Sequence, residues 1–188
     1  IKSSLYQKKS DSFPWSIIRK FEKKIILSLL GNTKNLSIVD VGSGSGFYTS
    51  IIYKNNPKEL YAIDNSSKML LHIKEKQVVK ILQNIETLKL HKKFDKLICA
   101  GLLEFTSKPT IVMKNINKIA KKDAILILLY PKNNFLGKIY QKFHVSNKIK
   151  INLFTKTDIL KIIKNSKWKL LKEKNFLFSS ALKLKKNK

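Results

Sequence analysis

The sequence predicts an α/β protein, doubly wound around a mostly parallel sheet of seven strands. Three observations lead to this prediction. From residue 36 to residue 131, short apolar runs of strand length alternate with segments of helical periodicity. A glycine-rich turn joins the first apolar run to the helix that follows it. Two strand-like segments near the C-terminal end follow each other without a helix between them, which is typical of an antiparallel edge.

The elements can be assigned in order along the chain. Apolar residues at near-3.6 spacing predict an amphipathic helix over residues 13–30, which Gly31 ends. The expected strands lie at 36–41, 59–63, 78–82, 96–100 and 124–129, and the expected helices at 46–54, 66–76 and 110–120. Residues 133–147 are expected to be rich in loop, before a helix over 155–165 that Thr155 caps. The closing strands are expected at 168–174 and 176–184, and a solvated tail at 183–188.

Composition limits the class of protein. Across 188 residues the hydrophobic content is 43%, and no apolar run reaches the roughly 18–20 residues that a membrane span needs. The N-terminal residues lack the apolar stretch of a signal peptide. The single cysteine, Cys99, excludes an internal disulfide and a Cys-rich zinc site, and no metal ligand set is expected. These features together predict a cytoplasmic protein.

The net charge of +27 has two interpretations. Of 39 basic residues only Arg19 is an arginine, while Lys, Asn and Ile, the residues of A/T-rich codons, are abundant. A surface that recognises phosphates or bases should retain arginine, whose planar fork suits those contacts. We therefore favour drift of base composition over a dedicated RNA surface. The charge still predicts salt-sensitive, nonspecific attraction to polyanions.

The turn Asp40-Val41-Gly42-Ser43-Gly44-Ser45-Gly46 lets a ligand approach the backbone closely, because its glycines carry no side chains. It does not match the dinucleotide pattern G-x-G-x-x-G, since Phe47 stands where that pattern requires glycine. The spacing D-x-G-x-G-x-G instead resembles the first motif of class I S-adenosylmethionine (SAM) dependent methyltransferases, a Rossmann-like family. The resemblance implies that the turn, with Asp40, Gly42, Ser43, Gly44 and Gly46, cradles the amino-acid part of SAM.

Asp64 lies 18 residues beyond Gly46, at the C-terminal end of the second predicted strand. Ligands of open α/β sheets bind at this edge, and an ionised carboxylate can accept hydrogen bonds from both ribose hydroxyls. The alternative is a solvated turn or helix-cap residue. The run from Asp64 to Leu70 also resembles the second motif of the family, which adds Asn65 and Met69 to the expected cofactor contacts.

After the third strand, the family usually has an Asp that meets the adenine ring. Here Asn84 takes its place, so its carbonyl would accept from the adenine amine and the amide of Ile85 would meet a ring nitrogen. An ordinary loop asparagine is the alternative. The stretch Phe94–Phe105 resembles the family's fourth strand, which implies that Ala100 and the residues after it face the transferable methyl. The family's Pro-Gly-Gly turn before the fifth strand is replaced by residues 121–123.

Methyl transfer from a sulfonium is an in-line displacement, so a general base is needed only when the acceptor starts protonated. Glu104, Tyr130 and His144 are the candidates, with capping or orienting, packing, and a surface position as their respective alternatives. Aromatic residues of the N-terminal segment could form a lid or face the core instead; these are Tyr6, Phe13 and Trp15.

Absent motifs narrow the acceptor. No Asn/Asp-Pro-Pro-aromatic run follows the fourth strand, and no Pro-Cys pair exists, which disfavours amino-group and cytosine C5 methylation. The sequence predicts a single domain whose acceptor is a small molecule, methylated at oxygen or carbon. The alternatives are an RNA or protein methyltransferase that uses the lysine surface, and a non-catalytic binding protein. The expected parts of the single domain are a helical cap (1–35), a cofactor-binding core (36–131), a variable substrate-side segment (132–154) and a C-terminal helix with closing strands (155–188).

Overall fold

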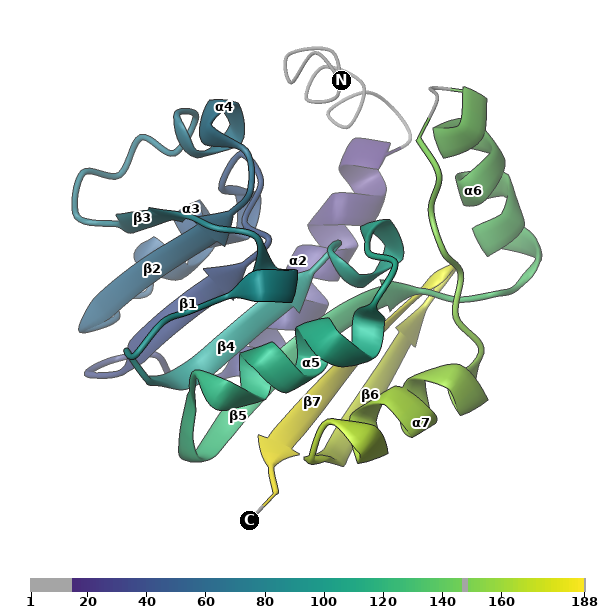
Figure 1. Cartoon of the computed structure of the whole chain (residues 1–188). Helices are drawn as coiled ribbons and strands as arrows, with labels where there is room; N and C mark the ends of the chain where they lie inside the picture. The colour runs from purple at the N-terminus through teal and green to yellow at the C-terminus, as the bar shows by residue number, and fades with distance from the viewer. Residues whose placement is uncertain (1–14, 147–148, 188) are drawn as a thin grey trace.

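A computed structural model describes residues 15–146 and 149–187 of the chain. Its centre is a seven-stranded sheet in the order β3-β2-β1-β4-β5-β7-β6 (Figure 1). The strands are β1 (Ser37–Val41), β2 (Glu59–Asp64), β3 (Val79–Leu82), β4 (Phe94–Ala100), β5 (Ala120–Pro131), β6 (Trp168–Phe176) and β7 (Ser179–Lys186). Strands β1 to β5 pair in parallel, whereas β7 runs antiparallel to both β5 and β6. The predicted α/β fold with an antiparallel C-terminal edge is confirmed, with β7 inserted one place in from the edge.

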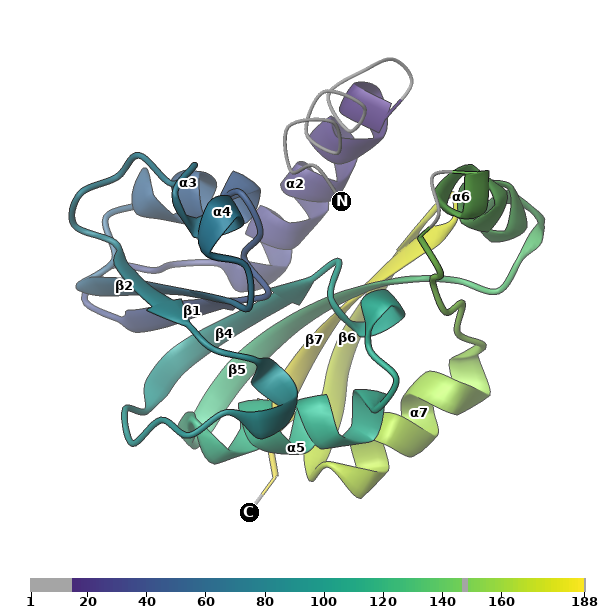
Figure 2. The same cartoon turned by 45° about the horizontal axis from the view of Figure 1, so that its top comes forward.

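Helices cover both faces of the sheet (Figure 2). On one face lie α2 (Trp15–Leu30), α3 (Phe47–Tyr53) and the single turn α4 (Ser67–Leu70); on the other lie α5 (Pro109–Lys118) and α7 (Lys156–Asn165). Two buried clusters fill these layers. Ile26, Leu30 and Ile52 belong to the first, and Val112 and Ile159 to the second. The interior strand β1 is buried at every position, as expected for a strand with helices on both sides.

Three sequence predictions about elements are wrong in detail. The helix expected over 66–76 ends after one turn, because the chain bends there to place Ile73 in the core beneath the glycine turn. The expected tail from 183 is strand up to Lys186, whose ammonium donates to the carbonyls of Asn117 and Ala120. The last strand begins at Ser179 rather than Phe176, after a turn in which Leu177 has a positive φ.

The segment expected to be loop over 133–147 contains the helix α6 (Phe135–Ser146). Asn134 is the reason the sequence was misleading. Its side-chain oxygen accepts from the amide of Gly137 at 2.8 Å, so an asparagine that suggested a loop starts a helix. Only Gly137 and His144 of this helix are buried.

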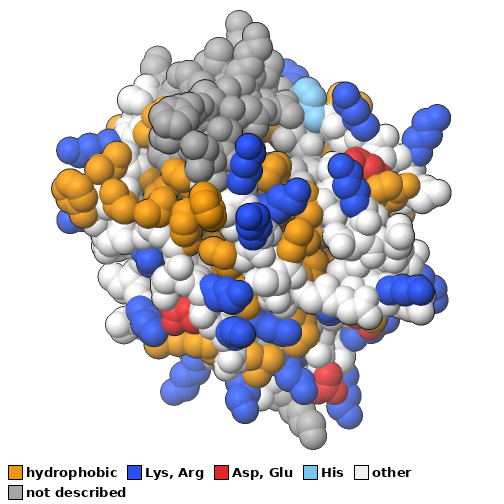
Figure 3. All heavy atoms as spheres, turned by 180° about the vertical axis from the view of Figure 1, so that it is seen from behind, with side chains coloured by type: hydrophobic (Ala, Val, Ile, Leu, Met, Phe, Trp, Pro, Cys, Tyr) orange, Lys and Arg blue, Asp and Glu red, His pale blue; other side chains and the backbone are white. Residues whose placement is uncertain are grey.

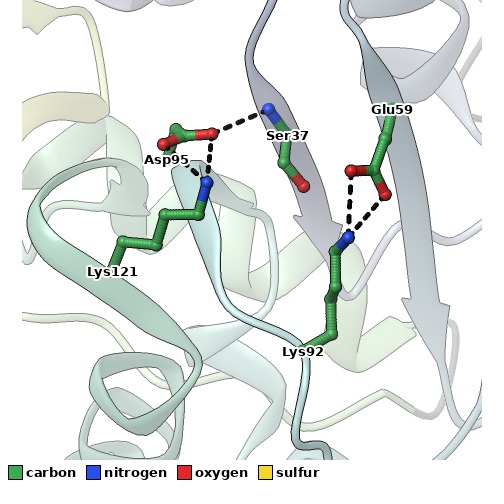
Figure 4. Close-up of polar contacts among 5 residues, drawn as sticks. All are labelled: Ser37, Glu59, Lys92, Asp95 and Lys121. Atoms are coloured by element: carbon green, nitrogen blue, oxygen red, sulfur yellow. Dashed lines mark hydrogen bonds and ion pairs between the residues drawn. The ribbon is translucent and has the colours of Figure 1, made fainter.

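Polar contacts tie the strands together at the end of the sheet opposite the glycine turn (Figure 4). Asp95 accepts from the amide of Ser37 at 2.9 Å and from the ammonium of Lys121, and Lys92 pairs with Glu59 at 2.7 Å. Lys121 and Asp123 belong to the segment expected to be a turn in place of Pro-Gly-Gly, but β5 already begins at Ala120. Asp123, within the strand, has a φ of 62°, the conformation that a glycine would favour. No helix in the described part of the chain is long and apolar enough to cross a bilayer.

Candidate functional site

The glycine turn after β1 is fixed to the neighbouring strand and open on one side. The amides of Gly42 and Ser43 both donate to the carbonyl of Ile63 in β2, at 2.8 and 3.0 Å. A Cβ on Gly42 would lie 2.9 Å from Leu102, so this position is closed to larger residues. A Cβ on Gly44 would meet nothing within 4 Å. The backbone at Gly44 therefore faces open space, as a cofactor cradle requires.

Gly46 ends this turn and caps α3 in the left-handed conformation, with φ at 86°. A Cβ there would lie 2.6 Å from Ile73, the residue on which the shortened α4 segment depends. The third glycine of the motif is thus explained by packing and backbone conformation.

Asp64 joins the glycine turn to the start of α4, two parts of the predicted cofactor site. One carboxylate oxygen accepts from the amide of Gly44 at 2.8 Å, and the other accepts from the amide of Ser66 at 2.9 Å. These bonds place Asp64 between the glycine turn and the start of α4. Each carboxylate oxygen retains a second acceptor site, so the capping role does not prevent ribose binding. Of the other two residues expected in this motif, Met69 is half-buried and Asn65 is exposed.

Asp40 lies behind the turn rather than in the open space. Its carboxylate is buried and accepts from the hydroxyl of Thr49 at 2.7 Å. Burial raises its pKa to about 6, despite the Thr49 bond that lowers it. Ser43, by contrast, has a buried hydroxyl oxygen that no described residue meets with a hydrogen bond. A polar ligand over the turn would satisfy that oxygen.

Asn84 caps the short 3₁₀ helix η1 (Ile85–Thr87), where its side-chain oxygen accepts from the amide of Glu86 at 2.9 Å. Ile85 is buried in the core. Asn115 of α5 holds this loop in place, since its amide donates to the carbonyls of Ile85 and Glu86 at 2.9 Å each. The sequence analysis missed Asn115; the signal was a lone amide among the apolar positions of a helix.

At the end of β4, Ala100 is half-buried and Gly101 turns the chain with φ at 74° into the 3₁₀ helix η2 (Leu103–Phe105). Glu104 of η2 is only 3% exposed, and one of its carboxyl oxygens has no hydrogen-bond partner among the described residues. Burial raises its pKa to about 8, with a smaller contribution from Glu22. The carboxyl group of Glu104 is therefore mostly protonated and uncharged at pH 7.

Glu22 is a second buried acid that the sequence analysis did not single out. It lies on α2, and burial raises its pKa although a hydrogen bond with Ser179 and the charge of Arg19 lower it. The pKa of Tyr48 on α3 is raised mainly by burial, and the charges of Glu22 and Glu104 raise it further. The signal in the sequence was an acid four residues after Ile18 and four before Ile26, on the apolar stripe of the helix.

The other two candidate bases are buried side chains. Tyr130 packs edge-to-face with Phe154 at 6.3 Å, and burial raises its pKa. His144 lies on the inner side of α6, edge-to-face with Tyr140 at 4.5 Å and with Phe105 of η2 at 5.9 Å. Burial lowers the pKa of His144 to about 4, so the imidazole is neutral at physiological pH. The structure thus places His144 beside the segment that carries Glu104.

The aromatic lid falls mostly outside the described residues. Tyr6 and Phe13 are not described, and Trp15 begins α2 with a side chain that is not described either. Within residues 15–146 and 149–187, no three His, Cys, Asp or Glu side chains are grouped so as to hold a metal ion.

Known proteins resemble the chain in sequence and in fold. A family model described as a methyltransferase domain matches residues 32–175. Ribosomal RNA small subunit methyltransferase A of Ehrlichia ruminantium (strain Gardel) is 42% identical over 45 residues, 24% of this chain and 17% of that protein. The tRNA U34 carboxymethyltransferase of Sulfurovum sp. (strain NBC37-1) is 28% identical over 102 residues, 50% of this chain and 34% of that protein. The matches thus span about a third or less of these relatives.

A solved structure shares the fold over most of the chain. Magnesium protoporphyrin IX methyltransferase from Synechocystis PCC 6803, with bound S-adenosylhomocysteine, superposes with a TM-score of 0.73 at 18% identity. The superposition covers 94% of this chain and 88% of that one. Given the family match over most of its length, the sheet order and the glycine turn, the chain belongs to the class I SAM-dependent methyltransferases.

Proposed function

We propose that the chain transfers a methyl group from SAM to a small-molecule acceptor, at an oxygen or a carbon atom. The observation that carries this proposal is the position of Glu104, a buried acid with an unsatisfied oxygen one short turn after β4. Leu102, two residues before Glu104, packs against the glycine turn at Gly42. An ionisable group is therefore close to the open cradle, where an acceptor would have to lie.

The residues around the cradle suit the parts of the cofactor. The backbone at Gly44 and the hydroxyl of Ser43 would hold the amino-acid part, and the carboxylate of Asp64 the ribose hydroxyls. Asn84 and the amide of Ile85 would meet the adenine, where the oxygen of Asn84 already has one donor and keeps one acceptor site. SAM supplies the electrophilic methyl group; the chain supplies alignment and the exclusion of water.

Glu104 would hold the proton of the acceptor. Because its pKa is about 8, the carboxyl group is poised to exchange a proton with a phenol, an enol or an acidic carbon near neutral pH. The neutral His144, which contacts the neighbouring Phe105, would form the acceptor side of the pocket. Tyr130 would contribute through packing against Phe154.

The test has two parts. Calorimetry should show that the intact chain binds SAM and S-adenosylhomocysteine, and isotope-labelled SAM incubated with a metabolite extract should give a labelled small molecule in mass spectrometry. Absence of SAM binding would contradict the enzyme proposal. Binding without transfer to any fraction would favour a non-catalytic binding protein.

An RNA acceptor is the second candidate, because both curated relatives are named for the modification of RNA. The excess of lysine over the surface would then serve as a docking field. The same labelled reaction, run with total tRNA and ribosomal RNA, separates the two proposals. Label in the RNA fraction that persists at elevated salt would favour this candidate over the small-molecule one.

A further inference from the structure

The outer side of α6 is unusual for a helix of a globular protein. Phe135 is 77% exposed and Ile139, one turn further on, is 48% exposed. Residues four apart share one face of a helix, so these two side chains and the exposed Leu136 form a single apolar patch. The buried residues Gly137 and His144 are seven apart and lie on the opposite face. Figure 3 shows hydrophobic side chains gathered on the side of the molecule where α6 lies.

Lysines border this patch along one side. Lys138 and Lys142 are also four apart on α6 and exposed, and no residue of the helix is acidic. They line a depression of about 450 Å³ together with Lys150 and with polar side chains, among them Gln141 and Asn152. None of the ion pairs found in the described ranges involves these three lysines.

We propose that α6 is a docking surface for an anionic lipid bilayer, with Phe135, Leu136 and Ile139 entering the interface and Lys138, Lys142 and Lys150 meeting the headgroups. An apolar stripe flanked by lysines without acidic residues is the pattern of a helix that lies in a membrane surface. We call this set of six residues the α6 surface.

Other occupants fit the α6 surface less well. A second copy of this chain would bring lysine against lysine, with no acid on the helix to compensate. A nucleic acid would match the lysines, but of the three apolar side chains only Phe135 could stack on a base, and Leu136 and Ile139 would stay uncovered. The lysines require an anionic partner and the exposed apolar side chains an apolar one. A bilayer with anionic headgroups meets both requirements.

The α6 surface is connected to the candidate site by hydrogen bonds. Gln141 of α6 donates to the carbonyl of Ile151 at 2.9 Å, and the amide of Asn152 donates to the carbonyl of Glu104 at 2.8 Å. The neighbouring residues Ile151 and Asn152, in the connection between α6 and α7, thus hold both the helix and the segment that carries Glu104. Docking through α6 would place the mouth of the site close to the bilayer.

Vesicle flotation tests the proposal on the full chain. The wild type is expected to float with vesicles of phosphatidylcholine and phosphatidylserine, and not with phosphatidylcholine alone. Phe135→Ser with Ile139→Ser should reduce the binding constant at least tenfold. Lys138→Gln with Lys142→Gln should reduce it by about fivefold for each lysine removed, most clearly at low salt.

The matched controls lie on α7. Lys161→Gln with Lys164→Gln removes the same charge from an exposed helix face, and Leu160→Ser removes a half-exposed apolar side chain. Both should leave vesicle binding nearly unchanged. Equal losses in the α6 and α7 variants would overturn the proposal in favour of diffuse attraction by net charge. Loss of RNA binding in the α6 variants, without vesicle binding by the wild type, would overturn it in favour of a nucleic-acid surface.

The outcome is separable from that of the proposed function. Calorimetry of SAM binding to the α6 variants should give the wild-type affinity, because α6 contributes no residue to the glycine turn. A chain that binds vesicles but not SAM would support docking and contradict the enzyme proposal, and the reverse result would do the opposite.

Discussion

Glu104 shows how one buried residue can be both costly and useful. Its carboxyl group is removed from water, so the neutral form is favoured, and one oxygen has no hydrogen-bond partner among the residues that the structure describes. A structural acid would be expected to find partners for both oxygens. Under the proposed function, a ligand would complete the hydrogen bonding of this oxygen.

Replacing Glu104 with Gln tests that role. Gln keeps the shape of the side chain but cannot take up or release a proton. SAM binding should therefore persist, while transfer falls on the order of 10²–10⁴-fold, the usual contribution of a proton-transferring side chain. If Glu104 acts as the base, transfer by the wild type should increase as pH rises through about 8, where its carboxyl group ionises. Single-turnover rates from pH 6 to pH 9 measure this. A variant with the wild-type rate and profile would leave Glu104 only an orienting role.

Replacing Asp64 with Ala tests the cofactor site. The change removes the acceptor for the ribose hydroxyls, so SAM affinity should fall by about 1–3 kcal/mol, the cost of leaving polar partners unpaired. Calorimetry gives the affinity, and thermal unfolding of the same variant gives the stability. Because Asp64 also accepts from the amides of Gly44 and Ser66, some stability should be lost as well. A loss of stability with unchanged SAM affinity would contradict the cofactor role.

Residues of the site differ in how far sequence could predict them. The glycine turn and Asp64 follow strand ends, and the edge of a parallel sheet fixes where such residues meet. Glu22 and Asn115 act on partners far away in sequence, Ser179 and the carbonyls of Ile85 and Glu86. The local sequence shows Glu22 and Asn115 only as polar residues on apolar faces of helices. What they contact depends on which elements pack together.

At the scale of elements, segments whose apolar side chains face the core were predictable, whereas α6 and the length of α4 were not. The apolar spacing of α2, α5 and α7 was sufficient to place them within a few residues. The helix α6 was missed because its apolar side chains mostly face outward and its N-terminal asparagines resemble a loop. The length of α4 was overestimated because burial of Ile73, rather than helix propensity, decides where the chain turns.

Gly137 is the position on which the packing of α6 depends. A Cβ at this residue would overlap the carbonyl oxygen of Lys132, so Gly137→Ala should force α6 away from the turn that precedes it. We expect a loss of about 1–3 kcal/mol, as for other overpacking substitutions. Hydrogen exchange should increase over α6 and stay unchanged in the central strands. Leu136→Ala, at the exposed neighbouring position, is the control; equal effects of the two would contradict this account.

At the scale of the whole molecule, pH should move the stability in a defined direction. Glu104 has a folded-state pKa of about 8, above the ordinary value of 4.5, so the folded state binds the proton more tightly. Its contribution to stability is complete below pH 4.5 and is lost as pH rises through about 8. His144, whose pKa is lowered to about 4, has the opposite effect: its contribution is present above 6.5 and is lost as pH falls through about 4.

We therefore expect the free energy of unfolding to decrease between about pH 6 and pH 8, and the variant Glu104→Gln to decrease less. The difference between the two proteins should grow from about pH 4.5 and level off above the folded-state pKa of about 8, by on the order of 3–5 kcal/mol over that whole range. Urea unfolding at a series of pH values measures both curves. Parallel curves for the two proteins would show that Glu104 is not the group responsible.

The fold class was predictable because strand and helix patterns alternate along the sequence. The order of the strands in the sheet was not predictable. No local pattern tells a strand which neighbour it will have; β7 is placed by its two ladders, to β5 on one side and to β6 on the other. The alternation of Leu182 and Leu184 with lysines predicts a strand with one buried face and nothing more.

That insertion of β7 has a consequence for biosynthesis. On a ribosome, β5 leaves the exit tunnel almost 50 residues before the strand that must pair with it, since β5 ends at Pro131 and β7 begins at Ser179. During this interval the nascent chain carries an uncovered strand edge lined by Ile125, Ile127 and Leu129. The interval before β7 emerges is then the period in which this strand edge is most exposed to aggregation and to chaperones.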